Sequence, residues 1–173
     1  MIDLRRFIRD IPDFPKPGIL FKDITPLLAD GPAFREMIEA LVAPFRGRVD
    51  TVLGIESRGF IIGAAAALAL GTGIAILRKP GKLPYRTHRA SYQLEYGSDT
   101  LEIHHDAVAQ GHRVLLIDDL LATGGTASAA IELVAHCGAT VTACAFVIEL
   151  AFLDGRKRLA PYEVHSLLRY DRP

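Results

Sequence analysis

The stretch V-L-L-I-D-D-L-L-A-T-G-G-T, residues 114–126, decides the fold class of this chain. Its first four residues, 114–117, are all apolar, which is typical of a parallel strand buried on both faces. The carboxylates of Asp118 and Asp119 follow, and then a glycine-bearing loop, residues 122–126, leads into an apolar helical stretch. The backbone N–H groups of such a loop and the positive end of the next helix are suited to bind a phosphate group.

The carboxylate pair indicates that the ligand also carries neutral hydroxyl groups. Carboxylates repel phosphate but accept hydrogen bonds well from a vicinal diol. The pattern therefore predicts a phosphorylated sugar with its diol at Asp118 and Asp119. The alternative is the acidic strand of a P-loop protein, but the only Gly-Lys pair, Gly81-Lys82, is followed by leucine and lacks the first glycine of that motif.

Length, charge and cysteine usage exclude several classes of protein. The 173 residues are half hydrophobic, so we expect a single domain, residues 1–173, with a substantial core. Twenty basic and twenty acidic residues give a formal net charge of zero, which does not favour nucleic acid as a partner. The cysteines, Cys137 and Cys144, form no C-x-x-C motif, and the N-terminus lacks the apolar core of a signal peptide. A reduced, cytoplasmic protein is expected.

One uncharged stretch, residues 59–77, has the length of a membrane span. It consists largely of alanine and glycine, and Gly71-Thr72-Gly73 divides it into two pieces. We therefore expect a buried helix, a turn and a short strand at residues 74–77, and no membrane association.

The remaining apolar patterns predict alternating strands and helices. This alternation predicts an α/β fold, mainly a parallel sheet flanked by helices, with binding loops at the carboxyl ends of the strands. The expected elements are a helix at 3–10, an ordered proline-rich loop at 11–26, a helix at 33–45, a strand at 51–55, a hairpin of 91–96 and 101–103 that turns at 97–99, a helix at 127–137, and strands at 140–148 and 160–166.

Two further segments suggest anion binding. Residues 56–59, E-S-R-G, follow the strand at 51–55 and open a helix, so they predict a second anion site that includes a guanidinium group. Residues 77–90 are basic, rich in proline and glycine, and without periodicity, which predicts a mobile surface loop. Such a loop is either a solvated charge run or a lid over a polyanion. His104, His105 and His112 lack the spacing of a metal motif, so no metal site is expected there.

Five segments resemble, in their order and separation, the type I phosphoribosyltransferases and in particular the adenine phosphoribosyltransferases. The segments are I-P-D-F-P-K-P-G-I-L-F-K-D-I-T-P-L-L, E-S-R-G-F, R-K-P-G-K-L-P, S-Y-Q-L-E-Y-G and V-L-L-I-D-D-L-L-A-T-G-G-T. The first and fourth are specific to the adenine branch. The resemblance implies the type I phosphoribosyltransferase fold, with an N-terminal helix and a hood over the base site in residues 1–30, and a flexible active-site loop and hairpin strand in residues 78–97.

The resemblance also implies a reaction in purine salvage. The 5-phosphoribosyl group of phosphoribosyl pyrophosphate (PRPP) is transferred to adenine, giving AMP and pyrophosphate. Mg²⁺ is implied as a cofactor that is held mainly by PRPP, without direct ligation by protein side chains. The family usually forms homodimers, so a homodimer is expected.

The resemblance assigns site residues by position. The ribose and 5-phosphate would be bound by Asp118, Asp119, Ala122, Thr123, Gly124, Gly125 and Thr126. Pyrophosphate would be bound by Glu56, Ser57, Arg58, Arg78, Lys79 and Lys82, with a cis peptide bond between Glu56 and Ser57. Adenine would be bound by Leu20, Phe21, Lys22 and Leu150. Glu95 and Arg58 would be catalytic, and the role of Tyr85 stays open.

Two alternatives remain. One is a phosphoribosyltransferase that acts on a 6-oxopurine. The other is a regulator of the same fold that senses PRPP without catalysis, although such a regulator is expected to carry an added basic domain or to lack catalytic residues.

Overall fold

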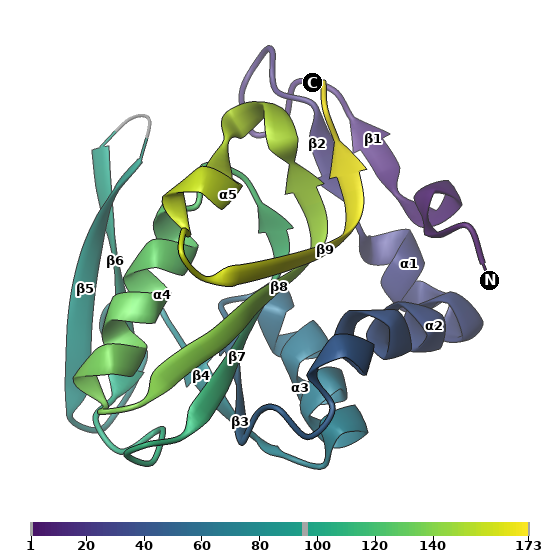
Figure 1. Ribbon diagram of the computed structural model, residues 1–173. Coiled ribbons are helices and arrows are strands. Elements are labelled where there is room, and N and C mark those ends of the chain that lie inside the picture. The colour runs from purple at the N-terminus through teal and green to yellow at the C-terminus, as the bar shows by residue number, and fades with distance from the viewer. Residues whose placement is uncertain (1, 95–96, 173) are drawn as a thin grey trace.

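A parallel β-sheet lies at the centre of the computed structural model, which describes residues 2–94 and 97–172 (Figure 1). Within these residues the sheet has five strands in the order β4-β3-β7-β8-β9, and every neighbouring pair is parallel. The predicted sheet type is therefore confirmed. The strands are β3 (Thr51–Ile55), β4 (Gly73–Leu77), β7 (Arg113–Leu121), β8 (Thr140–Leu150) and β9 (Glu163–Tyr170).

Helices cover both faces of the sheet (Figure 1). On one face α4 (Gly125–His136) packs on Leu53 and Leu116, and on the other α2 (Gly31–Val42) and α3 (Arg58–Leu70) pack on Val52 and Leu115. Side chains therefore alternate between two apolar cores, which explains why the strands read as continuous apolar runs. The shorter helices are η1 (Leu4–Phe7), α1 (Thr25–Ala29), η2 (Ala43–Phe45), η3 (Ala151–Leu153) and α5 (Gly155–Arg158).

The uncharged stretch at residues 59–77 forms most of α3, a turn and β4, as predicted. Gly71 has a φ of 69° and ends the helix, a conformation that glycine adopts without steric cost. Among the described residues, no helix is both long and apolar enough to cross a membrane.

An antiparallel hairpin of β5 (Thr87–Leu94) and β6 (Gly97–His104) lies outside the sheet, beside α4 (Figure 1). The turn predicted at residues 97–99 is wrong, because Ser98 and Asp99 pair with Gln93 and Tyr92 in the ladder. The predicted loop at 77–90 also ends early, since β5 begins at Thr87. Contacts between the strands explain why Asp99 lies in a strand and not in a turn. The Asp99 carboxylate accepts a hydrogen bond from the Tyr92 hydroxyl at 3.2 Å, and such cross-strand contacts override turn propensity.

The helix predicted at residues 3–10 is also wrong. Only η1 is helical, and β1 (Arg9–Ile11) then pairs with β2 (Phe21–Asp23) in an antiparallel ribbon. Oppositely charged partners on the two strands explain the difference: Arg9 pairs with Asp23 at 2.7 Å, and Lys22 with Asp10 at 2.8 Å. The ribbon lies beside β9 near the C-terminus (Figure 1).

Several predicted boundaries differ by a few residues. β7 continues through Asp118 and Asp119 to Leu121, so the carboxylate pair belongs to the strand and does not follow it. The helix predicted from 127 begins at Gly125. The last strand runs from Glu163 and not from residue 160, where the cis Ala160–Pro161 peptide lies outside the strand.

Candidate active site

A cavity of about 370 Å³ opens where β3 and β7 end. Its wall contains residues 55–58 at the end of β3 and residues 118–127, which include the carboxylate pair, the glycine loop and the start of α4. Lys79, Tyr92, Leu101 and Phe146 complete the lining. The structure thus brings together the two anion-binding segments that the sequence predicts, because both follow adjacent parallel strands of one sheet.

The glycine loop has a backbone geometry suited to bind a phosphate group. Gly124 has a φ of 78° and directly precedes α4, whose first N–H groups have no side-chain cap. Unpaired N–H groups at a helix N-terminus attract anions. The loop therefore presents backbone donors to the cavity.

Gly155, at the start of α5, packs directly behind this loop. A Cβ on Gly155 would lie 2.1 Å from the Ala122 carbonyl oxygen, and one on Gly124 would lie 2.7 Å from the Gly155 carbonyl oxygen. Only glycine at both positions permits this approach of the two backbones. Sequence reasoning missed Gly155, which lies 31 positions after Gly124 and belongs to no motif.

The carboxylate pair contacts Arg58 at the start of α3. The Arg58 guanidinium donates to the Asp119 carboxylate and also lies 5.2 Å from the centre of the Phe21 ring. The backbone N–H of Asp119 donates to the Asp118 carboxylate at 2.9 Å. Loss of water around Asp118 raises the pKa of its carboxyl group well above the ordinary value, and the charge of Asp119 adds to this effect.

Glu56 contacts the three basic loop residues of the predicted pyrophosphate site. Its carboxylate accepts hydrogen bonds from Lys82 Nζ at 2.5 Å, from the backbone N–H of Lys79 at 2.9 Å and from Arg78 Nε at 3.4 Å. Burial alone would raise the pKa of Glu56, but these donors outweigh it and lower the pKa to about 2. The peptide bond between Glu56 and Ser57 is cis, as the resemblance implies.

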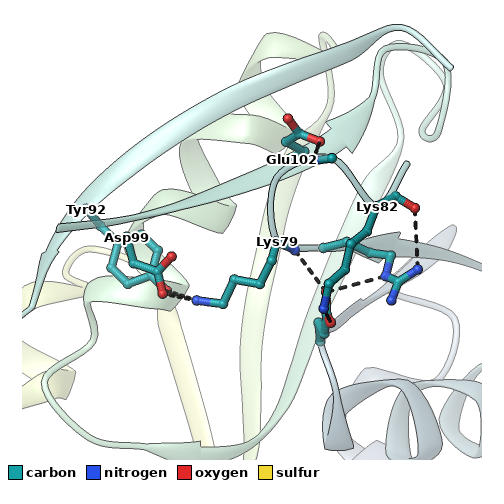
Figure 2. Close-up of polar contacts among 8 residues, drawn as sticks. Lys79, Lys82, Tyr92, Asp99 and Glu102 are labelled. Atoms are coloured by element: carbon teal, nitrogen blue, oxygen red, sulfur yellow. Dashed lines mark hydrogen bonds and ion pairs between the residues drawn. The ribbon is translucent and has the colours of Figure 1, made fainter. Parts of the chain in front are cut away.

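Lys79 reaches a second acid on the hairpin. Its ammonium group pairs with the Asp99 carboxylate beside Tyr92 (Figure 2). The ammonium nitrogen lies 3.3 Å from the Tyr92 hydroxyl. Each of the three basic loop residues predicted to bind pyrophosphate, Arg78, Lys79 and Lys82, is therefore paired with a carboxylate in this structure. The sequence gives no signal for Tyr92 or Asp99, because their role depends on how the hairpin folds over the loop.

None of the four described residues predicted to bind adenine lines this cavity, although Phe21 contacts Arg58 in its wall. Phe21 in β2 packs edge-on against Phe14, at 5.1 Å between ring centres, and carries the Arg58 guanidinium over its own ring. The Lys22 side chain points elsewhere, to Asp10 and the Tyr170 ring. Leu150 ends β8 and is half-buried, as is Leu20. Glu95 lies outside the described residues.

No group of three or more histidine, cysteine or acidic side chains is arranged to bind a metal ion within residues 2–94 and 97–172. His112 Nδ1 lies 2.8 Å from the Thr51 hydroxyl, and the His104 ring packs edge-on against Tyr85. These histidines thus have structural contacts.

A glycine loop, a carboxylate pair and an arginine thus meet at one edge of the parallel sheet. The family described as "Phosphoribosyl transferase domain" matches residues 25–167. The chain therefore belongs to the phosphoribosyltransferase family, as its sequence motifs indicate.

Relatives place it in the adenine branch of this family. The adenine phosphoribosyltransferase of Syntrophotalea carbinolica is 58% identical over 171 residues, which cover 98% of this chain and 100% of the relative. The crystal structure of the enzyme of that name from Rhodothermus marinus is 54% identical and has a TM-score of 0.93 over 96% of each chain. The Saccharomyces cerevisiae structure, solved with adenine and a dideoxy-imino-altritol bisphosphate, is 42% identical, with a TM-score of 0.91 over 96% of this chain and 97% of the yeast chain.

Proposed function

We propose that the protein transfers the 5-phosphoribosyl group of PRPP to adenine and releases AMP and pyrophosphate, a reaction of purine salvage. The observation that carries this function is the single cavity in which a phosphate loop, a carboxylate pair and Arg58 meet. The names of the relatives, and the adenine bound in the yeast structure, support adenine as the base. Incubation with adenine, PRPP and Mg²⁺ tests the proposal: AMP is expected, and PRPP binding without AMP would favour the regulator.

The ribose phosphate lies along the glycine loop and the carboxylate pair. Backbone N–H groups of residues 122–126 donate to the 5-phosphate, and Asp118 and Asp119 accept hydrogen bonds from the ribose 2- and 3-hydroxyls. The ion pair with Arg58 supports this arrangement, because it holds the Asp119 carboxylate in one orientation. The sugar is thereby fixed with its anomeric carbon toward the base.

Departure of pyrophosphate from the anomeric carbon leaves an oxocarbenium-like state, which adenine N9 attacks. No covalent enzyme intermediate is needed, so positioning and electrostatics supply the rate enhancement. Pyrophosphate takes its contacts from the segment Glu56-Ser57-Arg58 and from Arg78, Lys79 and Lys82. These three loop cations exchange Glu56 and Asp99 for the phosphate oxygens, and we assign the basic loop at residues 78–90 to a lid that closes during this exchange.

Mg²⁺ fits this site as a cofactor bound to the substrate. Asp118 and Asp119 both lie in the cavity wall, and Asp119 is already paired with Arg58. This donor set suits a cation that keeps water and substrate oxygens as most of its ligands. Asp118 and Asp119 would hold the substrate diol that the cation contacts, and the cation would supply charge neutralisation at the leaving pyrophosphate.

Adenine lies between Phe21 and Leu150, with its edge read by backbone groups of residues 20–22. Adenine donates from its 6-amino group and accepts at N1, whereas hypoxanthine reverses both. Backbone groups arranged for adenine would leave buried donors unpaired with hypoxanthine, which discriminates strongly. Glu95 takes part in proton transfer on the imidazole side of the base.

A homodimer is the assembly that the surface supports. Four apolar residues on the outer face of α3 and on the edge strand β4 are exposed: Ile61, Leu68, Ile74 and Ile76. Leu68 is the most exposed of the four, at 84%. Adjacent exposed apolar side chains of this kind mark protein interfaces.

A cytoplasmic location is supported by the free thiols of Cys137 and Cys144.

Replacement of Leu68 by glutamate is expected to convert the dimer to a monomer, since it places a charge on the apolar face. Light scattering coupled to gel filtration measures the mass. The control Tyr162→Glu changes an exposed side chain away from α3 and should leave the dimer intact. A wild-type monomer at micromolar concentration would contradict the proposal.

A further inference from the structure

Glu102 is a buried acid that the proposed reaction does not use. It lies in β6, is 1% exposed, and is more buried than any other acidic residue in the described part of the chain. A buried carboxylate is costly unless it is paired and hydrogen-bonded. Its partners therefore indicate what it holds in place.

Glu102 contacts the basic loop through both its backbone and its side chain. Its backbone N–H donates to the Arg78 carbonyl at 2.8 Å and its carbonyl accepts from the Arg78 N–H at 3.0 Å. Its Oε2 accepts a hydrogen bond from the backbone N–H of Gly81 at 3.1 Å. Its Oε1 lies 2.6 Å from Nε of Arg89, its partner in the ladder.

These contacts fix a tight turn. Pro80 and Gly81 occupy its centre, and Gly81 has a φ of 77°, which is typical of the third residue of a type II turn. Lys79 and Lys82 flank the centre, and both donate to Glu56. The turn is thus held by Glu56 from the sheet side and by Glu102 from the hairpin side.

We propose that Glu102 is a positioning residue for pyrophosphate binding. By holding the Gly81 N–H and the Arg78 backbone, it keeps the turn in the conformation in which Arg78 and Lys82 meet at Glu56 and Lys79 lines the cavity. An ordered turn binds a polyanion more tightly because less conformational entropy is lost on binding. The inference rests on the proposed function, since it assigns pyrophosphate to this turn.

Three substitutions separate the reach of the side chain from its charge. Glu102→Gln keeps an oxygen at the Gly81 N–H, and its amide group faces Arg89, whose exposed side chain can move into solvent. Glu102→Asp keeps the charge but withdraws it from Gly81 by one methylene. Glu102→Leu removes both.

Glu102→Asp and Glu102→Leu are expected to weaken PRPP binding by about tenfold or more, which is the effect of losing a hydrogen bond to a charged acceptor. Glu102→Gln is expected to bind PRPP within about threefold of wild type. Calorimetric titration measures the affinity for PRPP, and KM measures it in the reaction. KM for adenine and the affinity for AMP, which lacks pyrophosphate, should stay within about twofold because the turn does not contact them.

Leu41→Ala is the control for a general loss of stability, because it truncates the core on the opposite face of the sheet. This variant should have a lower Tm and wild-type affinity for PRPP. If Glu102→Leu does not fold, the comparison of Asp with Gln decides. Wild-type PRPP affinity in Glu102→Asp, or equal losses in Gln and Leu, would overturn the inference, whereas failure of the wild type to form AMP would overturn the proposed function.

Discussion

Replacement of Gly155 by alanine is expected to lower kcat/KM for PRPP by about 100-fold, since a displacement of about 1 Å in a binding loop has this effect. The added Cβ would lie 2.1 Å from the Ala122 carbonyl oxygen and 3.0 Å from the Gly124 nitrogen. Both atoms belong to the backbone of the glycine loop, so the loop or α5 must move. In the proposed arrangement, the loop N–H groups then no longer converge on the 5-phosphate.

The affinity for AMP measures this effect directly, because AMP carries the 5-phosphate and needs no pyrophosphate site. Gly31→Ala is the matched control: a Cβ there meets nothing within 4 Å and the backbone is not left-handed. It should bind AMP as the wild type does. Wild-type AMP affinity in Gly155→Ala would show that the contact between α5 and the loop does not position the phosphate.

Replacement of Asp118 by asparagine is expected to lower kcat/KM by about 10- to 100-fold, because it removes the carboxylate that we propose accepts hydrogen bonds from the ribose. The same change is expected to stabilise the protein without ligand. Loss of water and the charge of Asp119 raise the pKa of Asp118 in the folded state. The unfolded chain then releases the proton at lower pH than the folded protein does, so the wild type loses stability as the pH rises from the ordinary pKa toward the raised one.

Asparagine does not ionise, so its burial beside Asp119 does not cost stability as the pH rises. The Tm of Asp118→Asn at pH 8 should exceed that of the wild type by about 3 °C or more, and the difference should shrink at pH 4. Thermal unfolding at both pH values measures it. A lower Tm than wild type at pH 8 would mean that the Asp118 carboxylate is stabilised by its neighbours and not strained by them.

The sheet and the glycine loop between β7 and α4 could be predicted from sequence because their causes are local. The apolar runs at 51–55 and 114–117 require burial on both faces, and adjacent parallel strands place the residues after them at one edge. The family resemblance then linked these segments to PRPP and adenine, and the family is confirmed by the comparisons.

Other features could not be predicted because they depend on contacts between distant segments. Asp99 reads as a turn residue but lies in β6, where Lys79 and Tyr92 contact it. Arg9 reads as the polar face of a helix but pairs with Asp23 across a ribbon. Gly155 and Glu102 belong to no motif, and their contacts with the two anion-binding loops exist only in the folded chain.

The measurement that tests the proposed function most directly is a competition between adenine, hypoxanthine and guanine for PRPP in the presence of Mg²⁺. The expected product is AMP, with kcat/KM for adenine higher than for either 6-oxopurine by about 10⁴-fold, as a site with directed hydrogen bonds achieves. Removal of Mg²⁺ with a chelator should abolish turnover. Formation of IMP or GMP with comparable efficiency would contradict the assignment of the base site to adenine.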